Sequence, residues 1–272
     1  MTYFQAIILG MIQGASEFLP ISSSGHLVLA PTLFGWEFQP REAFIFDVLV
    51  QVATLSAVII YYWQDLKTIL YSWIKNLLAG QPFQEPESRL GWYLILSTIP
   101  AGFSALIFKD TLEASFSNPK FAAIFLLVTS LLLVIGELAG NRTRGLSSIT
   151  WLDSLLIGFF QVLALFPGIS RSGSTISGGL LRNFDRATAA RYSFLMAVPV
   201  MTAAGLMAGY DLIRSPLLLS NLPVYFAGFV SAAIVGYLAI RWLITYLSQR
   251  SLYVFALYCA LAGVSFLIFL FL

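Results

Sequence analysis

Six long apolar segments constrain this chain more than any other feature of its sequence. Each approaches or exceeds the roughly 17 to 25 apolar residues that a helix needs to cross a bilayer. The segments are residues 44–63, 92–108, 121–139, 187–208, 222–244 and 252–272. Because 58% of the 272 residues are hydrophobic and only 10% are charged, nothing is left over for a soluble domain. We therefore predict an all-α integral membrane protein, with a single polytopic membrane domain over residues 1–272.

An internal repeat relates the two halves of the chain. The stretch GMIQGASEFLPISSSG, which starts at Gly10, aligns without a gap with GFFQVLALFPGISRSG, which starts at Gly158, at an offset of 148. Seven of the sixteen aligned positions are identical, and matched Gly, Gln and Ser residues are unexpected by chance in so apolar a chain. We predict a duplication whose halves cover roughly residues 1–110 and 149–250.

Each copy interrupts its apolar pattern with a Pro/Gly/Ser loop. A second short apolar stretch follows the loop, at residues 26–33 in the first copy and 176–181 in the second. Such pieces are short for two full crossings and fit a re-entrant helix pair that enters and leaves on one side. Broken backbone is tolerated at membrane depth only where protein or a water-filled cavity covers it. We therefore expect the two loops to face each other near the midplane, and the three spans between the copies predict an inverted topology.

Lysine and arginine residues are distributed unequally between the two faces. Loops 64–91, 140–148, 182–191 and 241–251 carry ten of them. The opposite face carries four: Arg41, Lys109, Lys120 and Arg214. By the positive-inside rule the first face is cytoplasmic, which puts both termini and the first re-entrant pair on the outer side. Residues 65–79 are predicted to form an interfacial helix.

Arg171 lies in the second loop, in the stretch PGISRSGST. An arginine at the bilayer centre costs about 2.5 to 3.5 kcal/mol on insertion scales, and such residues usually face a cavity or pathway. Its neighbours supply hydroxyls and backbone N–H groups where a helix begins: Ser170, Ser172, Gly173 and Thr175. Together with the guanidinium they predict an oxyanion site, with phosphate the natural guest. The alternative is a structural Arg171, paired with a buried carboxylate to lock two helices.

The first loop carries complementary groups. Gln13 and Glu17 are four residues apart and therefore share one face of a helix. A carboxylate that faces a phosphate is repelled unless a cation lies between them, and oxygen ligands suit Mg²⁺ or Ca²⁺. We predict that Gln13 and Glu17 bind such a divalent cation. An ion pair between Glu17 and Arg171, without a metal, is the alternative.

His26 is the only histidine in the chain and follows the serines of the first loop. We predict a catalytic role for it, as acid/base or as nucleophile, although a lone histidine is often structural. Ser23 is aligned with Arg171 in the repeat. Its hydroxyl is the other candidate nucleophile, provided that His26 lies within hydrogen-bond reach.

Further polar residues are candidates for supporting roles. Four loop serines are predicted to contact phosphate, with helix capping as the alternative: Ser22, Ser24, Ser170 and Ser172. Asp47 and Gln51 share one face of an otherwise apolar span and are candidates to support the site. For Asp47, a helix-end position near the interface is the alternative. Glu137 and Asp153 lie close to predicted cytoplasmic helix ends, where an interfacial position is expected.

Several common catalytic motifs are missing from the sequence. It contains no P-loop, no dinucleotide glycine fingerprint, no Cys/His metal cluster and no GxSxG elbow. ATP-driven and redox chemistries are therefore disfavoured, and we expect no nucleic-acid partner.

The two loop motifs resemble those of the undecaprenyl-diphosphate phosphatase family, also called the bacitracin-resistance protein family. The motifs are QGASE followed by FLPISSSGHL, and PGISRSGST one repeat later. The resemblance covers the whole chain in length and span order. It implies an enzyme that removes the terminal phosphate from the C55 isoprenoid diphosphate on the outer face of the bacterial inner membrane. The product is the monophosphate lipid carrier for peptidoglycan.

The resemblance also implies roles for individual residues. The family's (E/Q)xxxE motif, associated with divalent-metal binding and catalysis, falls on Gln13 and Glu17. The family's loop serine and histidine fall on Ser23 and His26. Its PGxSRSxxT motif places functional residues at Ser170, Arg171, Ser172 and Thr175. Because the first motif position is Gln13 rather than Glu, charge neutralisation depends more on Glu17.

We therefore expect metal-assisted phosphoryl transfer, with Ser23 or His26 attacking the terminal phosphorus. The sequence does not decide between these two nucleophiles. A transporter or lipid flippase for isoprenoid phosphates is the second hypothesis, since secondary transporters are also built from inverted repeats with broken helices. The expected partners are the isoprenoid diphosphate and membrane lipids. Whether the chain forms a homodimer is left open.

Overall fold

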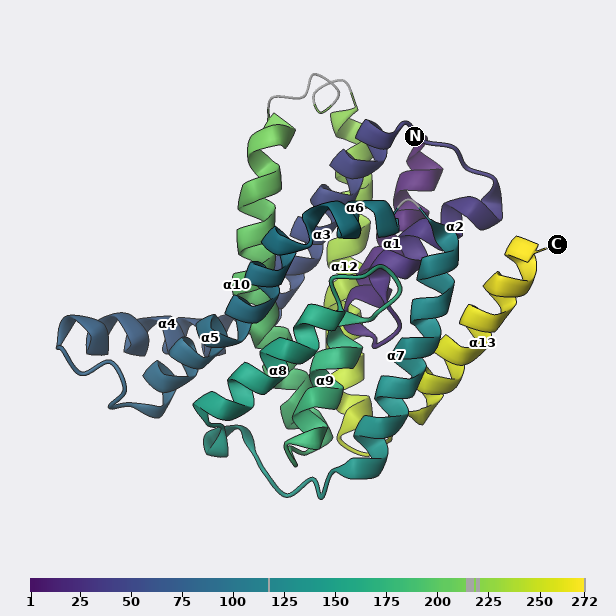
Figure 1. Cartoon of the computed structure of the whole chain (residues 1–272). Helices are drawn as coiled ribbons and strands as arrows, with labels where there is room; N and C mark the ends of the chain where they lie inside the picture. Colours follow the sequence, from purple (N-terminus) through teal and green to yellow (C-terminus); the bar gives the residue numbers. More distant parts are fainter. Residues whose placement is uncertain (117, 214–217, 219–220, 272) are drawn as a thin grey trace.

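The computed structural model of the chain is built from helices joined by short loops (Figure 1). It describes every residue except 117, 214–217, 219–220 and 272, so the predicted surface charge at Arg214 lies outside the described residues. No β-strand occurs in the part of the chain that is described. The helices are α1 (Tyr3–Phe18), α2 (Ser23–Phe34), α3 (Pro40–Tyr61), α4 (Trp63–Leu78), α5 (Pro86–Ile107), α6 (Lys109–Phe116), α7 (Pro119–Ala139), α8 (Trp151–Leu163), α9 (Arg171–Leu181), α10 (Arg186–Ile213), α12 (Leu222–Leu247) and α13 (Tyr253–Phe271), with a 3-10 turn at Leu146–Ser148.

Six of the described helices are long and apolar enough to cross a membrane, which confirms the predicted number of spans. They are α3, α5, α7, α10, α12 and α13. Helices α3 and α5 begin earlier than predicted, at Pro40 and Pro86. Both prolines stand in the first turn, where a fixed φ and a missing N–H are favourable. The chain is therefore a multi-pass, all-helical membrane protein.

Two pairs of shorter helices carry the repeated motifs. Helices α1 and α2 have 16 and 12 residues, and α8 and α9 have 13 and 11. At 1.5 Å per residue none of the four reaches the roughly 30 Å of the hydrocarbon core. In Figure 1 the pair α1–α2 extends from the upper end of the molecule and the pair α8–α9 from the lower end. This arrangement is of the kind expected for re-entrant pairs; the inverted repeat itself stays a prediction.

The repeated glycines have a packing role. Helix α1 packs most extensively on α12, and α8 packs on α5. A Cβ atom on Gly10 would lie 2.3 Å from the carbonyl oxygen of Gly228, and one on Gly158 would lie 2.6 Å from that of Ser97. Since real Cβ atoms essentially never come closer than 3.0 Å to a heavy atom, both positions need glycine. The match of Gly10 with Gly158 in sequence therefore corresponds to two close helix crossings.

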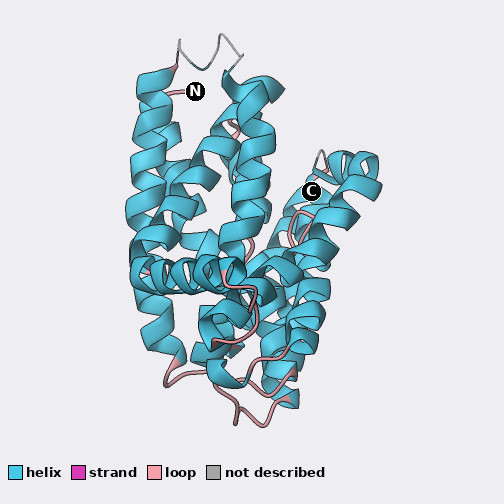
Figure 2. Ribbon diagram, turned by 90° about the vertical axis from the view of Figure 1, so that its left-hand side faces the viewer, coloured by secondary structure: helices cyan, strands magenta, loops and turns pink. Residues whose placement is uncertain are grey.

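Helix α4 and the first turns of α5 form an arm that projects sideways from the body in Figure 1 and towards the viewer in Figure 2. A helix at residues 65–79 was predicted, and α4 confirms its presence; its position at the membrane interface stays a prediction. Glu85 closes the arm, because its carboxylate accepts hydrogen bonds from Ser72 Oγ at 2.7 Å and Lys75 Nζ at 2.9 Å.

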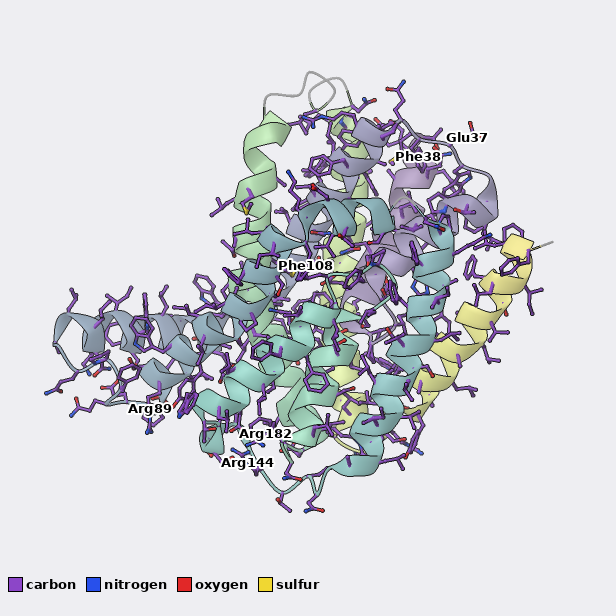
Figure 3. The ribbon with its side chains drawn as sticks, viewed as in Figure 1. Glu37, Phe38, Arg89, Phe108, Arg144 and Arg182 are labelled. Atoms are coloured by element: carbon purple, nitrogen blue, oxygen red, sulfur yellow. The ribbon has the colours of Figure 1, made fainter. Side chains whose placement is uncertain are left out.

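The two ends of the body differ in charge. Figure 3 shows Arg144 and Arg182 at the lower end and Glu37 at the upper end, where the N-terminus also lies. Helix α13 runs upward from the lower end to the C-terminus. Both termini thus lie away from the arginine-rich loops; which end faces outward stays a prediction.

Two buried carboxylates organise the arginine-rich end. Glu137 accepts from Arg186 Nη2 at 2.7 Å and also binds Arg142. Asp153 accepts from Arg144 Nη2 at 2.6 Å and from Arg182 Nε at 2.7 Å. Both carboxylate side chains are fully buried. Both acids lie near helix ends, as predicted, and each is a buried anchor for two arginines. Their position at the membrane interface stays a prediction.

Asp153→Asn is expected to lower the free energy of unfolding of the detergent-solubilised protein at pH 7 by about 2 kcal/mol. The loss is smaller than for a fully buried ion pair because Arg144 and Arg182 are partly exposed to solvent. Burial alone would raise the pKa of Asp153, but hydrogen bonds from Arg144, Arg182 and Thr150 hold that pKa well below its usual range. A depressed folded-state pKa stabilises the fold above the unfolded pKa of about 4, and this contribution is lost as the pH falls towards the folded value. Thermal unfolding from pH 7 to about pH 2 should therefore show a steeper acid loss for wild type than for the variant. Parallel pH curves for the two proteins would contradict this.

Candidate active site

The two motif loops contact each other inside the protein. A Cβ atom on Gly25 would lie 3.1 Å from Cα of Gly168, and Ser172 Oγ donates to the carbonyl oxygen of Leu19 at 3.3 Å. Gly168 has φ +97°, and a Cβ atom there would lie 2.2 Å from the carbonyl oxygen of Ala122. Only glycine fits this position. The PGIS turn therefore lets the second loop lie directly against α7 and the first loop.

Glu17 is the centre of the contact between the loops. Its Oε1 accepts from Arg171 Nη2 at 2.9 Å. Its Oε2 accepts from Ser23 Oγ at 2.6 Å and from Gln13 Nε2 at 3.0 Å. The Glu17 side chain is 9% exposed and that of Arg171 is 14% exposed. The ion pair considered as an alternative from the sequence is thus present, and it brings a carboxylate, a guanidinium and a hydroxyl into direct contact.

Arg171 is positioned by α9 and α10. It is the first residue of α9, and its Nη1 donates to the carbonyl oxygen of Ser193 at 3.1 Å. Its Nε is buried and has no hydrogen-bond partner among the described residues. A buried guanidinium with an unused donor is costly, and an anion between the loops would satisfy it. The arginine therefore combines a structural contact with an unfilled binding capacity.

A cavity of about 390 Å³ opens beside these groups. Its polar lining consists of Glu17, Ser23, Ser24, Gln51, Gln161 and Arg171, and apolar residues such as Leu112, Val200 and Met201 form other parts of its wall. A polar floor with apolar walls suits a ligand with a charged head and an apolar tail. Gln51 thus reaches the site as proposed for a supporting residue, whereas Asp47 does not line this cavity.

Ser22 and Ser170 cap the second helix of each pair. Ser22 Oγ accepts from the N–H of Gly25 at 3.2 Å, and Ser170 Oγ accepts from the N–H of Gly173 at 3.0 Å. Ser22 adopts φ +72°, which is rare for a residue other than glycine. Both serines are buried and absent from the cavity wall. Both hydroxyls therefore cap helices, which was the alternative to phosphate contact. Their contact with phosphate stays a prediction.

The remaining residues of the second motif support Arg171. Thr175 Oγ1 donates to the carbonyl oxygen of Arg171 at 2.8 Å and lies 2.6 Å from Ser193 Oγ. Ser172 Oγ donates to the carbonyl oxygen of Leu19, and the N–H of Gly173 donates to Ser170 Oγ. All three motif residues are buried. Their predicted contact with substrate is untested, and their observed contacts hold the arginine in place.

His26 is not among the residues that line this cavity. Its Nδ1 is 2.7 Å from the carbonyl oxygen of Ser22, and its Nε2 is 2.6 Å from Tyr258 Oη. Since a carbonyl only accepts, Nδ1 carries the proton and Nε2 accepts from the tyrosine in the neutral ring. The ring also stacks on Tyr258. Both ring nitrogens are thus engaged by Ser22 and Tyr258, and the catalytic role of His26 stays a prediction.

The donors around Glu17 fit a divalent cation. Gln13 is 1% exposed, and its Oε1 has no hydrogen-bond partner among the described residues. An amide oxygen, a carboxylate and the Ser23 hydroxyl are the hard donors that Mg²⁺ or Ca²⁺ prefers. No group of three or more His, Cys, Asp or Glu residues capable of holding a metal occurs in the described part of the chain. A cation here would therefore be held by the Glu17 carboxylate together with neutral oxygen donors.

Three neighbours of the site were not predicted. Gln161 lines the cavity, and its buried Oε1 has no partner among the described residues; its match with Gln13 in the repeat was the available signal. Ser193 and Tyr258 contact Arg171 and His26 from α10 and α13. Both lie in apolar spans far along the chain, and no local pattern marks them.

Comparison with known proteins places the chain in a family. Residues 6–265 match the family described as bacitracin resistance protein BacA. The chain belongs to this family. An undecaprenyl-diphosphatase of Chlorobaculum parvum is 43% identical over 278 residues, covering 98% of this chain and 97% of that protein. Proteins with the same name from Chlorobium phaeovibrioides and Thermomicrobium roseum are 41% and 38% identical, covering 99% and 98% of this chain and 98% of each of those proteins. The BacA family match includes both motif loops, five of the candidate spans in full and the first part of α13.

Proposed function

We propose that this BacA-family chain is an undecaprenyl-diphosphatase, a hydrolase that converts the C55 isoprenoid diphosphate into the monophosphate carrier and phosphate. Relatives of that name match it over nearly their whole length. The observation that carries the chemistry is the 2.6 Å hydrogen bond from Ser23 Oγ to Glu17 Oε2 at the wall of a cavity shared with Arg171. A hydroxyl already donating to a carboxylate is prepared to lose its proton as it attacks.

The proposed step uses Ser23 as nucleophile and Glu17 as base. Ser23 Oγ forms a bond to the terminal phosphorus and transfers its proton to Glu17, while the bond from that phosphorus to the bridging oxygen breaks. The leaving group is the isoprenoid monophosphate. Water then attacks the phosphoserine, which releases inorganic phosphate and restores the hydroxyl. Ser23 is preferred to His26 because the serine lines the cavity and both histidine nitrogens are already bound elsewhere.

Arg171 stabilises the charge of the phosphates. Its Nε is unpaired and its Nη2 bonds Glu17, so the guanidinium can bind a phosphate oxygen while it stays beside the base. Preorganised charge of this kind is the main source of catalysis in phosphoryl transfer. Gln13 and Glu17 would hold a divalent cation, which when bound would neutralise part of the negative charge of the diphosphate.

The substrate determines how the protein sits in the membrane. The apolar walls of the cavity leave the isoprenoid tail between helices or in the lipid. We place the end with α1, α2 and both termini on the outer side of the bacterial inner membrane, because the opposite end carries most arginines. The product carrier is used for peptidoglycan synthesis, and its recycling underlies bacitracin resistance. Formation of a homodimer stays an open part of this proposal.

A transporter or flippase is not favoured. That hypothesis depended on the architecture alone, and fold does not determine function. A transporter has no need for a serine hydroxyl held by a buried carboxylate, and the named relatives are diphosphatases.

Glu17→Gln should lower the rate of phosphate release from C55 diphosphate by on the order of 10² to 10⁴-fold, the usual contribution of a positioned general base. The amide retains the size of the carboxylate but is a poor base. Purified wild type, measured with and without chelator, supplies the reference and tests the cation at the same time. Glu87→Gln, the same substitution at an exposed glutamate outside this cavity, is the matched control and should retain the wild-type rate. Undiminished hydrolysis by Glu17→Gln would refute the proposed base.

A further inference from the structure

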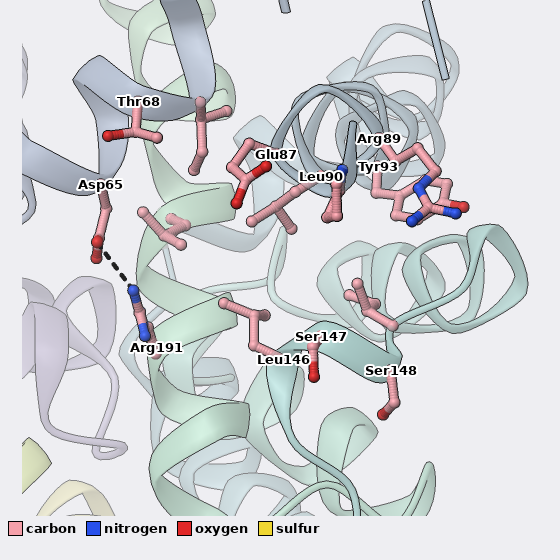
Figure 4. A pocket seen from close by; sticks show the side chains of 14 residues that line it. Asp65, Thr68, Glu87, Arg89, Leu90, Tyr93, Leu146, Ser147, Ser148 and Arg191 are labelled. Atoms are coloured by element: carbon pink, nitrogen blue, oxygen red, sulfur yellow. Dashed lines mark ion pairs between the residues drawn. The ribbon is translucent and has the colours of Figure 1, made fainter. Parts of the chain in front are cut away.

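A second polar cavity lies at the arginine-rich end and shares no lining residue with the cavity at Ser23. It has a volume of about 360 Å³ and lies between α4, α5, α10 and the turn at Leu146–Ser148. Figure 4 shows its charged side chains: Asp65, Glu87, Arg89 and Arg191. Arg191 Nη2 lies 2.9 Å from Asp65 Oδ1. None of these four residues has a role in the proposed hydrolysis.

The cavity continues into an apolar groove. The groove has a volume of about 780 Å³ and separates the α4–α5 arm from α10. Ile69 and Leu195 line both spaces. Asp65 and Ile69 are four residues apart on α4, and Arg191 and Leu195 are four apart on α10, so each pair shares a helix face. The ion pair therefore stands at the mouth of the groove.

The groove is suited to a hydrocarbon chain. Its lining is almost entirely apolar, with Trp63, Leu70 and Ile74 from α4, Ile95 from α5, and Val198 and Leu206 from α10. Most of these side chains are strongly exposed, Leu206 at 73% and Trp63 at 57%. Exposed apolar surface next to a membrane-spanning helix is covered by lipid in a bilayer.

The charges of the cavity specify the headgroup. Two arginines and two carboxylates give it no net charge, so it does not select for an anion alone. Arg191 is 45% exposed and uses one donor on Asp65, which leaves guanidinium donors for a phosphate. Glu87 is exposed and forms no ion pair with another described residue, and its carboxylate points into the cavity (Figure 4). The cavity thus offers both a phosphate donor and an ammonium acceptor.

We propose that this cavity and groove form a binding site for a zwitterionic phospholipid of the phosphatidylethanolamine class. Arg191 binds the phosphate at the mouth of the groove, Glu87 binds the primary ammonium, and one acyl chain lies between the arm and α10. The bound lipid would fix the arm to the body. This proposal does not depend on the proposed hydrolysis.

Lipid-dependent thermal unfolding and native mass spectrometry of the delipidated protein test the site. Dioleoylphosphatidylethanolamine should bind about tenfold more tightly than the phosphatidylcholine and phosphatidylglycerol of the same chains, because a hydrogen bond to a charged group is lost in both. The quaternary ammonium of phosphatidylcholine has no N–H, and phosphatidylglycerol has no ammonium. Glu87→Gln should remove this preference without changing phosphate release.

A second variant tests the groove. Ala203→Trp fills the groove, so this variant should no longer retain the lipid. Leu131 lies on α7 and is 58% exposed, so Leu131→Trp should retain the lipid as wild type does. Equal binding of the three lipids to wild type, or an unchanged preference in Glu87→Gln, would overturn the headgroup assignment. Full lipid retention in Ala203→Trp would overturn the groove assignment.

Discussion

Ser23→Ala is expected to reduce phosphate release from C55 diphosphate by on the order of 10³ to 10⁶-fold, the range seen when an enzyme loses its nucleophile. The substitution removes one oxygen atom, which lies at the cavity wall and donates to Glu17 at 2.6 Å. Ser23 is the first residue of α2, and its side chain makes no other hydrogen bond to a described residue. The fold should therefore persist, with an unchanged melting temperature in detergent.

A matched control and a trapped intermediate make this result specific. Ser24 also lines the cavity, but among the described residues its hydroxyl is hydrogen-bonded only to Ser22 Oγ, at 3.4 Å. Ser24→Ala should therefore cost less than about tenfold. Rapid acid quench of wild type should yield phosphate bound to Ser23, and Ser23→Ala should yield none. Phosphate trapped on His26, or hydrolysis by Ser23→Ala near the wild-type rate, would assign the nucleophile elsewhere.

The spans could be predicted from the sequence, but several of their ends could not. Apolar length alone identifies six crossings because no water satisfies backbone groups in the hydrocarbon core. Helix α5 nevertheless begins at Pro86, six residues before the apolar run. Its first turns belong to the arm, where polar side chains such as Glu87 and Arg89 are exposed. Helix propensity and capping, rather than hydropathy, decide where such a helix starts.

The contact between the loops was predictable because each copy of the repeat carries one of the two loop motifs. The matched stretches around Glu17 and Arg171 predicted that the loops face each other, and the structure joins these two residues at 2.9 Å. The position of His26 was not predictable. Its distance from Ser23 along α2 suggested a shared site, but a hydroxyl 232 residues later, on Tyr258, binds its Nε2. Long-range contacts of this kind leave no periodic signal in an apolar helix.

Glu17 and Arg171 together raise the question whether the arginine serves the fold or the substrate. A purely structural pair would leave the folded protein active once the arginine is removed, because Glu17 and Ser23 would keep their own bond. If Arg171 instead binds the phosphates of the substrate, its removal should abolish activity even though the protein stays folded. The unpaired Nε of Arg171 and its place on the cavity wall favour this second role.

Arg171→Ala is therefore expected to lower kcat/KM by on the order of 10³ to 10⁵-fold, as for other arginines that stabilise a transferring phosphoryl group. Arg171→Lys should recover only part of the loss, because an ammonium cannot bind Glu17, Ser193 and a phosphate with the same planar fork. Arg182→Ala is the matched control at the other end of α9: it removes a contact to Asp153 and should lower stability but not kcat. Kinetics and thermal unfolding of the three variants separate the two roles. If folded Arg171→Ala retained the wild-type kcat/KM, the arginine would only stabilise the packing of the helices, and its role in binding the diphosphate would be refuted.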